Sequence, residues 1–528
     1  MPKQKTDDLV QLISSLTRSE KRHFRIFVRR NQASDDILFL KLFDFLDKYG
    51  TYDEGRILKK FPNIKKRQLS NLKAHLYKQL LISLRLLNRN HDLDTEIREY
   101  IDYARVLYNK GLYRQSLDIL SKTKQKALET KRNLLALEIV EFEKHIESQY
   151  ITRSIETRAE KLTEESIEIY DKLLKINEYS NLAIRLYGLY LKTGFVRNEE
   201  DYTMITTFFH SNLPKRKSKE MDFFERINYH QTCTWYHHIT QNFTMSYRHN
   251  QSWVDAFHEQ PEMIVHEAPL YLKAMHNLLT TLFNLWHYDA FIFNLKKLEN
   301  LEQEDYIQLT NNTQGLYYLY YYVHEIDRHF MEGTYTEGIK LVDGLMKIID
   351  SDVYNWDSYR VMLFYYKIAC LYFGSGDNSK AIDYLNLIIN QRNPDYREDI
   401  QCFARILNLM AHFELGNERL VEYQIKSVYR FVGKMQDIHE VQREIFRFLR
   451  RTPRMRPSQL KQEFVDLKER LEIAQYKRFE RRPFLYLDII SWLESKIEQK
   501  TVQEVVREKF LKRKRRVVQL NLVAETEV

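Results

Sequence analysis

Apolar residues recur along most of the chain at the 3.6-residue period of an α-helix. One stripe predicts a helix over 36–49, which Gly50 ends, and consists of Leu38, Leu42, Phe45 and Leu46. A short helix is predicted at about 53–60, and a Pro-containing turn follows it. The long helix after this turn has a longer leucine stripe, and this first block runs to about residue 91. Only 13 Gly and 9 Pro occur in 528 residues, which leaves little material for the tight turns of a β-rich fold. We therefore predict an all-α protein.

Three Thr-x-x-Glu segments have the spacing of a capping box, in which the two side chains satisfy amides at the start of a helix. They begin at Thr17, Thr334 and Thr501. The last of them predicts a C-terminal helix that ends near Arg516.

Two segments share a finer pattern of helix, turn and helix. The clearer one runs over about 362–395, where Ala369 and Ala381 are twelve positions apart and a glycine lies seven positions after the first. A second runs from about residue 97, where Ala104 and Ser116 have the same separation. This is the separation at which the tetratricopeptide repeat places the small residues that let its two helices approach.

This pattern resembles the tetratricopeptide repeat, and the resemblance implies a right-handed α-solenoid of helix hairpins. The opening Leu16-Thr-Arg-Ser-Glu-Lys-Arg22 is similar to uncharacterised bacterial helical-repeat proteins. We predict a small basic helical module at 1–91, tetratricopeptide-like repeats at 92–451, and basic C-terminal helices with a tail at 452–528.

The charge is distributed unevenly. Residues 1–91 contain 20 Lys and Arg against nine Asp and Glu, and residues 442–516 contain 22 against 11. The stretch between them is acidic, although the whole chain carries a formal charge of +9. Two basic ends around an acidic middle indicate contact with a polyanion, or association between the ends and the middle of different copies.

Targeting and disulfide signals are absent from the sequence. The three cysteines are too few and too scattered for a disulfide framework or a Cys-x-x-Cys metal site. The start has no apolar segment of a signal peptide, and no run of about 18 apolar residues follows. We expect a cytoplasmic protein that does not enter a membrane.

Motifs for catalysis are also absent, and we expect a non-enzymatic protein without a cofactor. The nearest pattern is His324-Glu-Ile-Asp-Arg-His329, but its histidines are five apart and therefore face different sides of a helix. Gly374-Ser-Gly376 follows a helix rather than a strand, so it reads as a repeat turn and not as a nucleotide loop. The histidines at 230–287 read as packing residues.

Candidate partner-binding residues follow from the resemblance, because first helices line the concave face of tetratricopeptide proteins. It implies Tyr366, Cys370 and Phe373 in one repeat, and Arg105 and Tyr108 in the other. The run Tyr317-Tyr-Leu-Tyr320-Tyr-Tyr322 has five tyrosines that cover every face of a helix. Core packing and an aromatic peptide-binding surface both remain open for this run, with Tyr320 as its candidate contact.

A nucleic-acid interface is the alternative, and it depends on the N-terminal module. Residues 55–91 contain ten basic residues and no Asp or Glu. Short helix, turn and long helix are compatible with a helix-turn-helix. The candidate contacts are Lys65, Lys66, Arg67, Asn71, Lys73, His75 and Lys78. A basic helix face also suits plain solvation or an acidic protein partner.

The function that the sequence favours is a scaffold that binds a protein or peptide through stacked helix hairpins. The alternative is a nucleic-acid-binding regulator that uses the basic N-terminal module. The sequence identifies neither the partner nor the oligomeric state.

Overall fold

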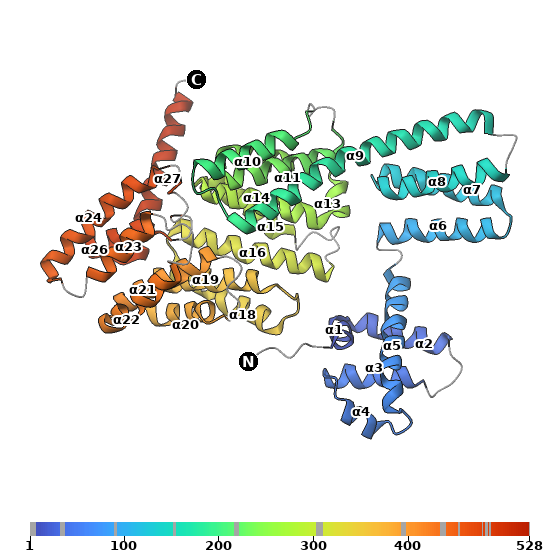
Figure 1. Ribbon diagram of the computed structural model, residues 1–528, viewed down its shortest axis with the longest axis horizontal. Coiled ribbons are helices and arrows are strands. Elements are labelled where there is room, and N and C mark those ends of the chain that lie inside the picture. Colours follow the sequence, from blue (N-terminus) through green and yellow to red (C-terminus); the bar gives the residue numbers. More distant parts are fainter. Residues whose placement is uncertain are drawn as a thin grey trace. The chain divides into compact units, whose positions relative to one another are not determined.

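The computed structural model describes residues 7–31, 37–88, 92–150, 155–215, 221–301, 310–391, 398–432, 440–451, 455–477, 479–480, 484 and 487–526 (Figure 1). All regular secondary structure in these residues is helical, which confirms the prediction of an all-α protein. The chain divides into two compact units, Met1–Leu174 and Lys175–Val528, and the division falls inside one long helix.

The regular structure that is described in unit 1 is helical. The helices are α1 (Asp8–Ser15), α2 (Arg18–Asn31), α3 (Leu38–Tyr49), α4 (Glu54–Lys60), α5 (Lys66–Asn88), α6 (Leu93–Asn109), α7 (Tyr113–Glu129), α8 (Asn133–Tyr150) and the first part of α9 (Ile155–Thr193).

Two separate hydrophobic cores occur in unit 1. Helices α1 to α5 enclose the first, in which the rings of Phe24 and Phe43 lie 4.8 Å apart. Helices α6 to α9 enclose the second. The predicted module boundary at residue 91 lies between these two cores.

The small pair of the second repeat-like segment lies where α6 meets α7. Ala104 and Ser116 are fully buried, and the Ser116 hydroxyl donates a 2.8 Å hydrogen bond to the Ala104 carbonyl. Because a larger side chain at either position would separate the helices, the twelve-residue spacing has a direct packing reason here.

Unit 2 holds the remaining helices. They are α10 (Glu199–Asn212), α11 (Phe223–Ile239), α12 (Phe243–Glu259), α13 (Glu262–His266), α14 (Ala268–Asn284), α15 (Tyr288–Asn300), α16 (Asn311–Glu332), α17 (Tyr335–Gly338), the 3₁₀ turn η3 (Ile339–Leu341), α18 (Val342–Ser351), α19 (Ser358–Ser375), α20 (Asn378–Ile389), α21 (Glu398–Glu414), α22 (Glu418–Val432), α23 (Glu440–Arg451), α24 (Pro457–Gln475), α26 (Ile489–Glu498) and α27 (Val502–Thr526).

Unit 2 has a smaller core among α9, α10 and α11 and a larger one that extends from α11 to α27, because most of its helices pack against their neighbours in sequence. Ala369 on α19 and Ala381 on α20 are fully buried where these two helices meet. Residues on both sides of the predicted boundary at residue 451 share the larger core, since Phe448 lies 5.2 Å from Phe464 and 6.2 Å from Trp492 between ring centroids.

The last helix departs from neighbour-only packing. In a one-dimensional repeat array each unit contacts only the adjacent units. Here α27 returns to the end of α16, where Arg507 donates to the Glu332 carbonyl at 3.1 Å. Gly333 has φ +64° there, and a Cβ added to it would lie 2.5 Å from the Arg507 nitrogen. The α27 backbone therefore touches the end of α16 directly.

Two of the three predicted capping boxes are confirmed. The amide of Thr17 donates to Glu20 at 2.7 Å, and the amide of Thr501 donates to Glu504 at 2.8 Å. The box at Thr334 is wrong, because its hydroxyl bonds to His329 Nδ1 at 2.8 Å instead. The helix that begins after Thr501 ends at Thr526 rather than near Arg516.

No helix in the described part of the chain is both long enough and apolar enough to cross a membrane.

Candidate functional site

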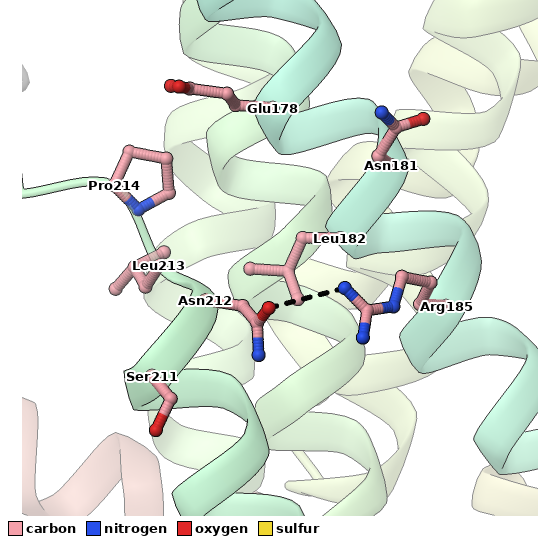
Figure 2. A pocket seen from close by; sticks show the side chains of 8 residues that line it. All are labelled: Glu178, Asn181, Leu182, Arg185, Ser211, Asn212, Leu213 and Pro214. Atoms are coloured by element: carbon pink, nitrogen blue, oxygen red, sulfur yellow. Dashed lines mark hydrogen bonds between the residues drawn. The ribbon is translucent and has the colours of Figure 1, made fainter.

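One hollow in the described part of unit 2 is polar and shallow. It measures about 330 Å³ and lies between α9 and the end of α10. Figure 2 shows Arg185 of α9 reaching Asn212 of α10, with a hydrogen bond of 3.2 Å between them. Its other lining groups, which include Glu178 and Pro214, come from the rims of these two helices.

A second hollow, which we call the inner groove, measures about 210 Å³ and draws on helices far apart in sequence. Its lining residues come from α9, α11, α12, α14 and α19. They are Tyr187, Tyr190, Leu191, Thr234, Trp235, His238, Ser246, Asn250, His276, Asn277, Thr280, Thr281 and Tyr359.

A buried polar network forms the floor of the inner groove. Thr234 of α11 donates to Asn250 of α12 at 2.8 Å. Asn250 in turn donates to the Thr281 hydroxyl at 2.8 Å and to the Asn277 carbonyl at 3.2 Å, both on α14. Because these buried groups satisfy one another, the three helices are held in one arrangement.

Aromatic rings form one wall of the inner groove. Trp235 of α11 lies 4.8 Å from Tyr187 and 5.6 Å from Tyr190, both on α9, between ring centroids. Trp235 is half-buried and Tyr187 is exposed, so this wall offers ring surface to a ligand.

A series of charged and polar groups ends at His276 of α14, which lies on the opposite wall of the inner groove. His276 Nδ1 lies 2.9 Å from His324 Nε2, and His324 Nδ1 lies 3.5 Å from an Asp327 carboxylate oxygen. Asp327 also accepts a hydrogen bond from Lys367 of α19. The His276 ring stacks on Tyr320 with 4.2 Å between centroids and 11° between planes.

The charges in this series of groups determine which ring nitrogens of His324 and His276 carry protons. Burial alone would raise the pKa of Asp327, but Lys367 and His324 outweigh it and lower the pKa. Burial lowers the pKa of His324, and it lowers the pKa of His276 well below the usual value. The carboxylate therefore favours a proton on His324 Nδ1, so that Nε2 accepts from His276 Nδ1. This assignment leaves His276 Nε2 as a hydrogen-bond acceptor.

The groove face of α14 carries further groups that are open to a ligand. Lys273, His276, Asn277 and Thr280 follow one another at helical spacing, and all four are half-buried. Lys273 has no carboxylate within ion-pair distance in the described residues, and burial lowers its pKa. Neither the Asn277 amide nor the Thr280 hydroxyl bonds to another described side chain. The face can thus donate and accept hydrogen bonds along about two helical turns.

The structure places most of the predicted partner-binding residues of unit 2 in the core. Tyr366 and Phe373 are buried in α19, and Tyr320 is buried beneath His276. Cys370 is half-buried, and burial raises the pKa of its thiol to about 12. Tyr320 therefore supports a wall of the groove, while Tyr366 and Phe373 pack α19.

The two predicted residues of unit 1 lie together at a different place. Arg105 of α6 is exposed, with its guanidinium 4.8 Å from the Phe142 ring centroid. Tyr108 lies 5.5 Å from the same ring, and its hydroxyl is 3.0 Å from His145 Nε2. They form a small aromatic surface between α6 and α8.

The predicted nucleic-acid residues lie on α5 and just before it. Six of the seven are exposed: Lys65, Lys66, Arg67, Asn71, His75 and Lys78. Lys73 differs, because it is half-buried, pairs with Asp7 and lies 4.0 Å from the centroid of Tyr52. Among the described residues, Lys65, Arg67 and Lys78 have no carboxylate within ion-pair distance. The buried leucines of α5 face the first core, opposite this basic surface.

Some of the other histidines of unit 2 pack in the interior, whereas His266 and His287, which were expected to be packing residues, are exposed. His230 Nδ1 lies 3.1 Å from His249 Nδ1, and the His237 ring stacks on His249 at 5.4 Å. His324 and His329 face different partners, as their five-residue spacing predicts. Within the described residues, no group of His, Cys, Asp and Glu is arranged to hold a metal ion.

The inner groove was not predicted from the sequence, although one local pattern on α14 indicates it. Helix α14 is apolar on most of its surface, and its polar positions 273, 276, 277 and 280 fall on one face. Such a narrow polar stripe on an otherwise buried helix indicates a solvent-lined groove. The contributions of α9 and α19 depend on tertiary packing and leave no local pattern.

The chain was compared with protein-family models, with curated proteins and with solved structures, and none of them matches.

Proposed function

We propose that unit 2 is a protein-binding scaffold whose inner groove holds an extended segment of a partner. The observation that carries the proposal is the pairing of an aromatic wall with a stripe of open polar groups on α14. Aromatic side chains supply contact area, and amide and hydroxyl groups can bond the backbone of an extended chain.

The size of the inner groove favours a peptide over a compact small molecule. Pockets for small molecules commonly measure about 300–1,000 Å³. A hollow of about 210 Å³ is smaller and suits one or two side chains of a segment that continues along the surface. The bonded floor keeps the groove open before binding, which limits the entropy lost when a partner is held.

The helix pairs support a second part of the proposal, namely a right-handed solenoid of tetratricopeptide-like hairpins. Its support is the matching twelve-residue pair of small buried side chains at α6/α7 and at α19/α20. On this arrangement α11, α14 and α19 are first helices of their pairs, and each contributes to the inner groove.

Site-specific photo-crosslinking tests the groove directly. A photoreactive amino acid at Leu191, on the exposed rim of the groove, should crosslink to a partner in cells. Leu387 on α20 is the matched control, because it has nearly the same exposure and does not line the groove. Crosslinks to the same proteins from both positions, or from Leu387 alone, would contradict the proposal.

Nucleic-acid binding by α5 is the second candidate. It is favoured by the exposure of Lys65, Arg67 and Lys78 and by their lack of carboxylate partners in the described residues. If these three residues contact phosphates, changing all of them to Gln should weaken oligonucleotide binding by the full chain on every sequence alike. Unchanged binding would remove this candidate.

A further inference from the structure

Helix α27 changes in character at Phe510. Before that residue its charged side chains have partners, since Arg507 bonds to the Glu332 carbonyl, Glu508 to Lys500, and Lys509 pairs with Glu494. The five residues that follow Phe510 are all exposed. Four of them form what we call the basic row: Lys512, Arg513, Lys514 and Arg515. In the described residues none of the four has a carboxylate within ion-pair distance.

The helix dipole does not account for the basic row. Cations are stabilised near the C-terminal turn of a helix, and the sequence places a helix end near Arg516. The helix instead continues to Thr526, and its last turn contains no basic residue. Like charges three positions apart, such as Lys512 and Arg515, repel each other on a helix. The row therefore lowers helix stability unless an anion neutralises it.

Aromatic side chains lie beside the basic row. The Arg513 guanidinium is 4.3 Å from the ring centroid of Trp286, and the Lys514 ammonium is 5.7 Å from that of Tyr288. Trp286 is 41% exposed and has φ +57°, a left-handed conformation that Lys131 and Gln241 also take at the corresponding position after α7 and α11. A bulky side chain in this conformation is strained. The turn thus keeps an exposed ring next to the cations at a cost to stability.

We propose that the basic row, with the exposed ring of Trp286, binds single-stranded nucleic acid. A row of cations follows the phosphodiester backbone, and exposed rings stack on unpaired bases, which is the combination used by proteins that bind single strands. Paired bases are not free to stack on protein rings. Binding to a membrane surface needs a broad apolar face, whereas residues 511–515 include a single apolar side chain, Leu511. The inference is independent of the inner groove.

Fluorescence anisotropy of the full chain with labelled oligonucleotides tests the assignment. The probes are a 20-nucleotide poly-dT, a 20-nucleotide poly-U and a mixed-sequence duplex of 20 base pairs, and unlabelled polyglutamate is the competitor. One variant changes Lys512, Arg513, Lys514 and Arg515 to Gln. A second variant makes the same change at Lys65, Lys66, Arg67 and Lys78 and tests the α5 candidate. The matched control removes the same charge at Lys110, Arg114, Lys122 and Lys347, which are exposed and belong to neither surface, and it should bind like the wild type. A third variant is Trp286→Leu.

The single strands should bind, and their affinity should fall steeply between about 50 and about 200 mM salt as counterion release requires. The basic-row variant should lose at least tenfold in affinity, and Trp286→Leu should lose roughly tenfold for single strands and little for the duplex. The thermal midpoint of the basic-row variant should not fall, because the four basic side chains make no ion pair in the described residues and the substitutions remove their mutual repulsion.

Other outcomes overturn the assignment. Single strands bound equally by the wild type and by the basic-row variant would do so, and a loss in the α5 variant alone would move nucleic-acid binding to the N-terminal module. Duplex preferred over single strands with no effect of Trp286→Leu would exclude the stacking role. Displacement by polyglutamate as readily as by poly-dT would identify an acidic protein as the partner, and absence of binding even at low salt would end the proposal.

Discussion

Replacing Gly333 by Ala should loosen the contact between α27 and the end of α16. Two terms add at this position. The left-handed backbone, with φ +64°, costs about 1 kcal/mol for an alanine. The new Cβ would also lie 2.5 Å from the Arg507 nitrogen, well inside van der Waals contact, so α27 must move.

The movement disturbs the apolar contacts that dock α27. Val505, Val506 and Phe510 are buried there, and full burial of such a side chain is worth about 1.5–3 kcal/mol. If a part of this is lost, we expect the free energy of unfolding to fall by about 2–4 kcal/mol in total. Gly416→Ala is the matched control, because Gly416 has φ +70° and nothing within 4 Å of its added Cβ. It should cost only the backbone term of about 1 kcal/mol.

Urea unfolding followed by circular dichroism measures both losses, and hydrogen exchange locates them. In Gly333→Ala the amides of α27 should exchange faster, while Gly416→Ala should leave them unchanged. A truncated chain that ends at Lys500 lacks α27. In it, Gly333→Ala should lower the free energy of unfolding no more than Gly416→Ala does. Equal losses for the two substitutions in the full chain would refute the docking of α27 on α16.

Three further predictions concern a helix contact in unit 2, a buried ion pair in unit 1 and a buried histidine in unit 2. Ala369→Leu or Ala381→Leu should lower the free energy of unfolding by roughly 1–3 kcal/mol, because both side chains are fully buried between α19 and α20; unchanged unfolding of both variants would disprove this helix contact. Lys124→Met should cost about 3 kcal/mol in unit 1, because it leaves the buried Glu143 without the ammonium 2.6 Å away, and adding Glu143→Leu should recover most of the loss; a double variant no more stable than the single one would be the contrary result. Burial lowers the pKa of His249 from 6.5 to about 4, so the unfolded state binds more protons and stability should fall as the pH drops from about 6.5 towards 4; urea unfolding at these pH values checks this, and stability that rises on acidification across the window would contradict it.

Local patterns in the sequence predict most of the helices of the fold. The period of the apolar residues predicts the helices, and the twelve-residue spacing of Ala369 and Ala381 predicts a close helix contact. The capping box at Thr334 fails because His329, five residues earlier, takes the hydroxyl on which the box depends. The contact of α27 with the end of α16 could not be predicted from the sequence. Gly333 is the single local sign of it, and the two segments are more than 160 residues apart.

The candidate site is harder to predict than the fold. The resemblance to a repeat family selects Tyr366 and Phe373, but both are buried in α19. The inner groove instead depends on how α9 and α19 close around α14, and residues such as Tyr187 and Tyr359 meet only in the folded chain. Tyr320 is the one predicted contact of unit 2 that the structure places against a groove residue, where it stacks on His276.

The most direct test of the inner groove is to fill it. Thr280 is half-buried on the groove face of α14, so Thr280→Trp should occupy the hollow without breaking a hydrogen bond to the described side chains. Lys347→Trp adds the same side chain at an exposed position on α18, which does not line the groove. We expect proteins that co-purify with the wild-type chain and with Lys347→Trp to fall by about tenfold or more with Thr280→Trp, at an unchanged thermal midpoint. Recovery of the same proteins in the same amounts with all three chains would contradict a binding role for the inner groove.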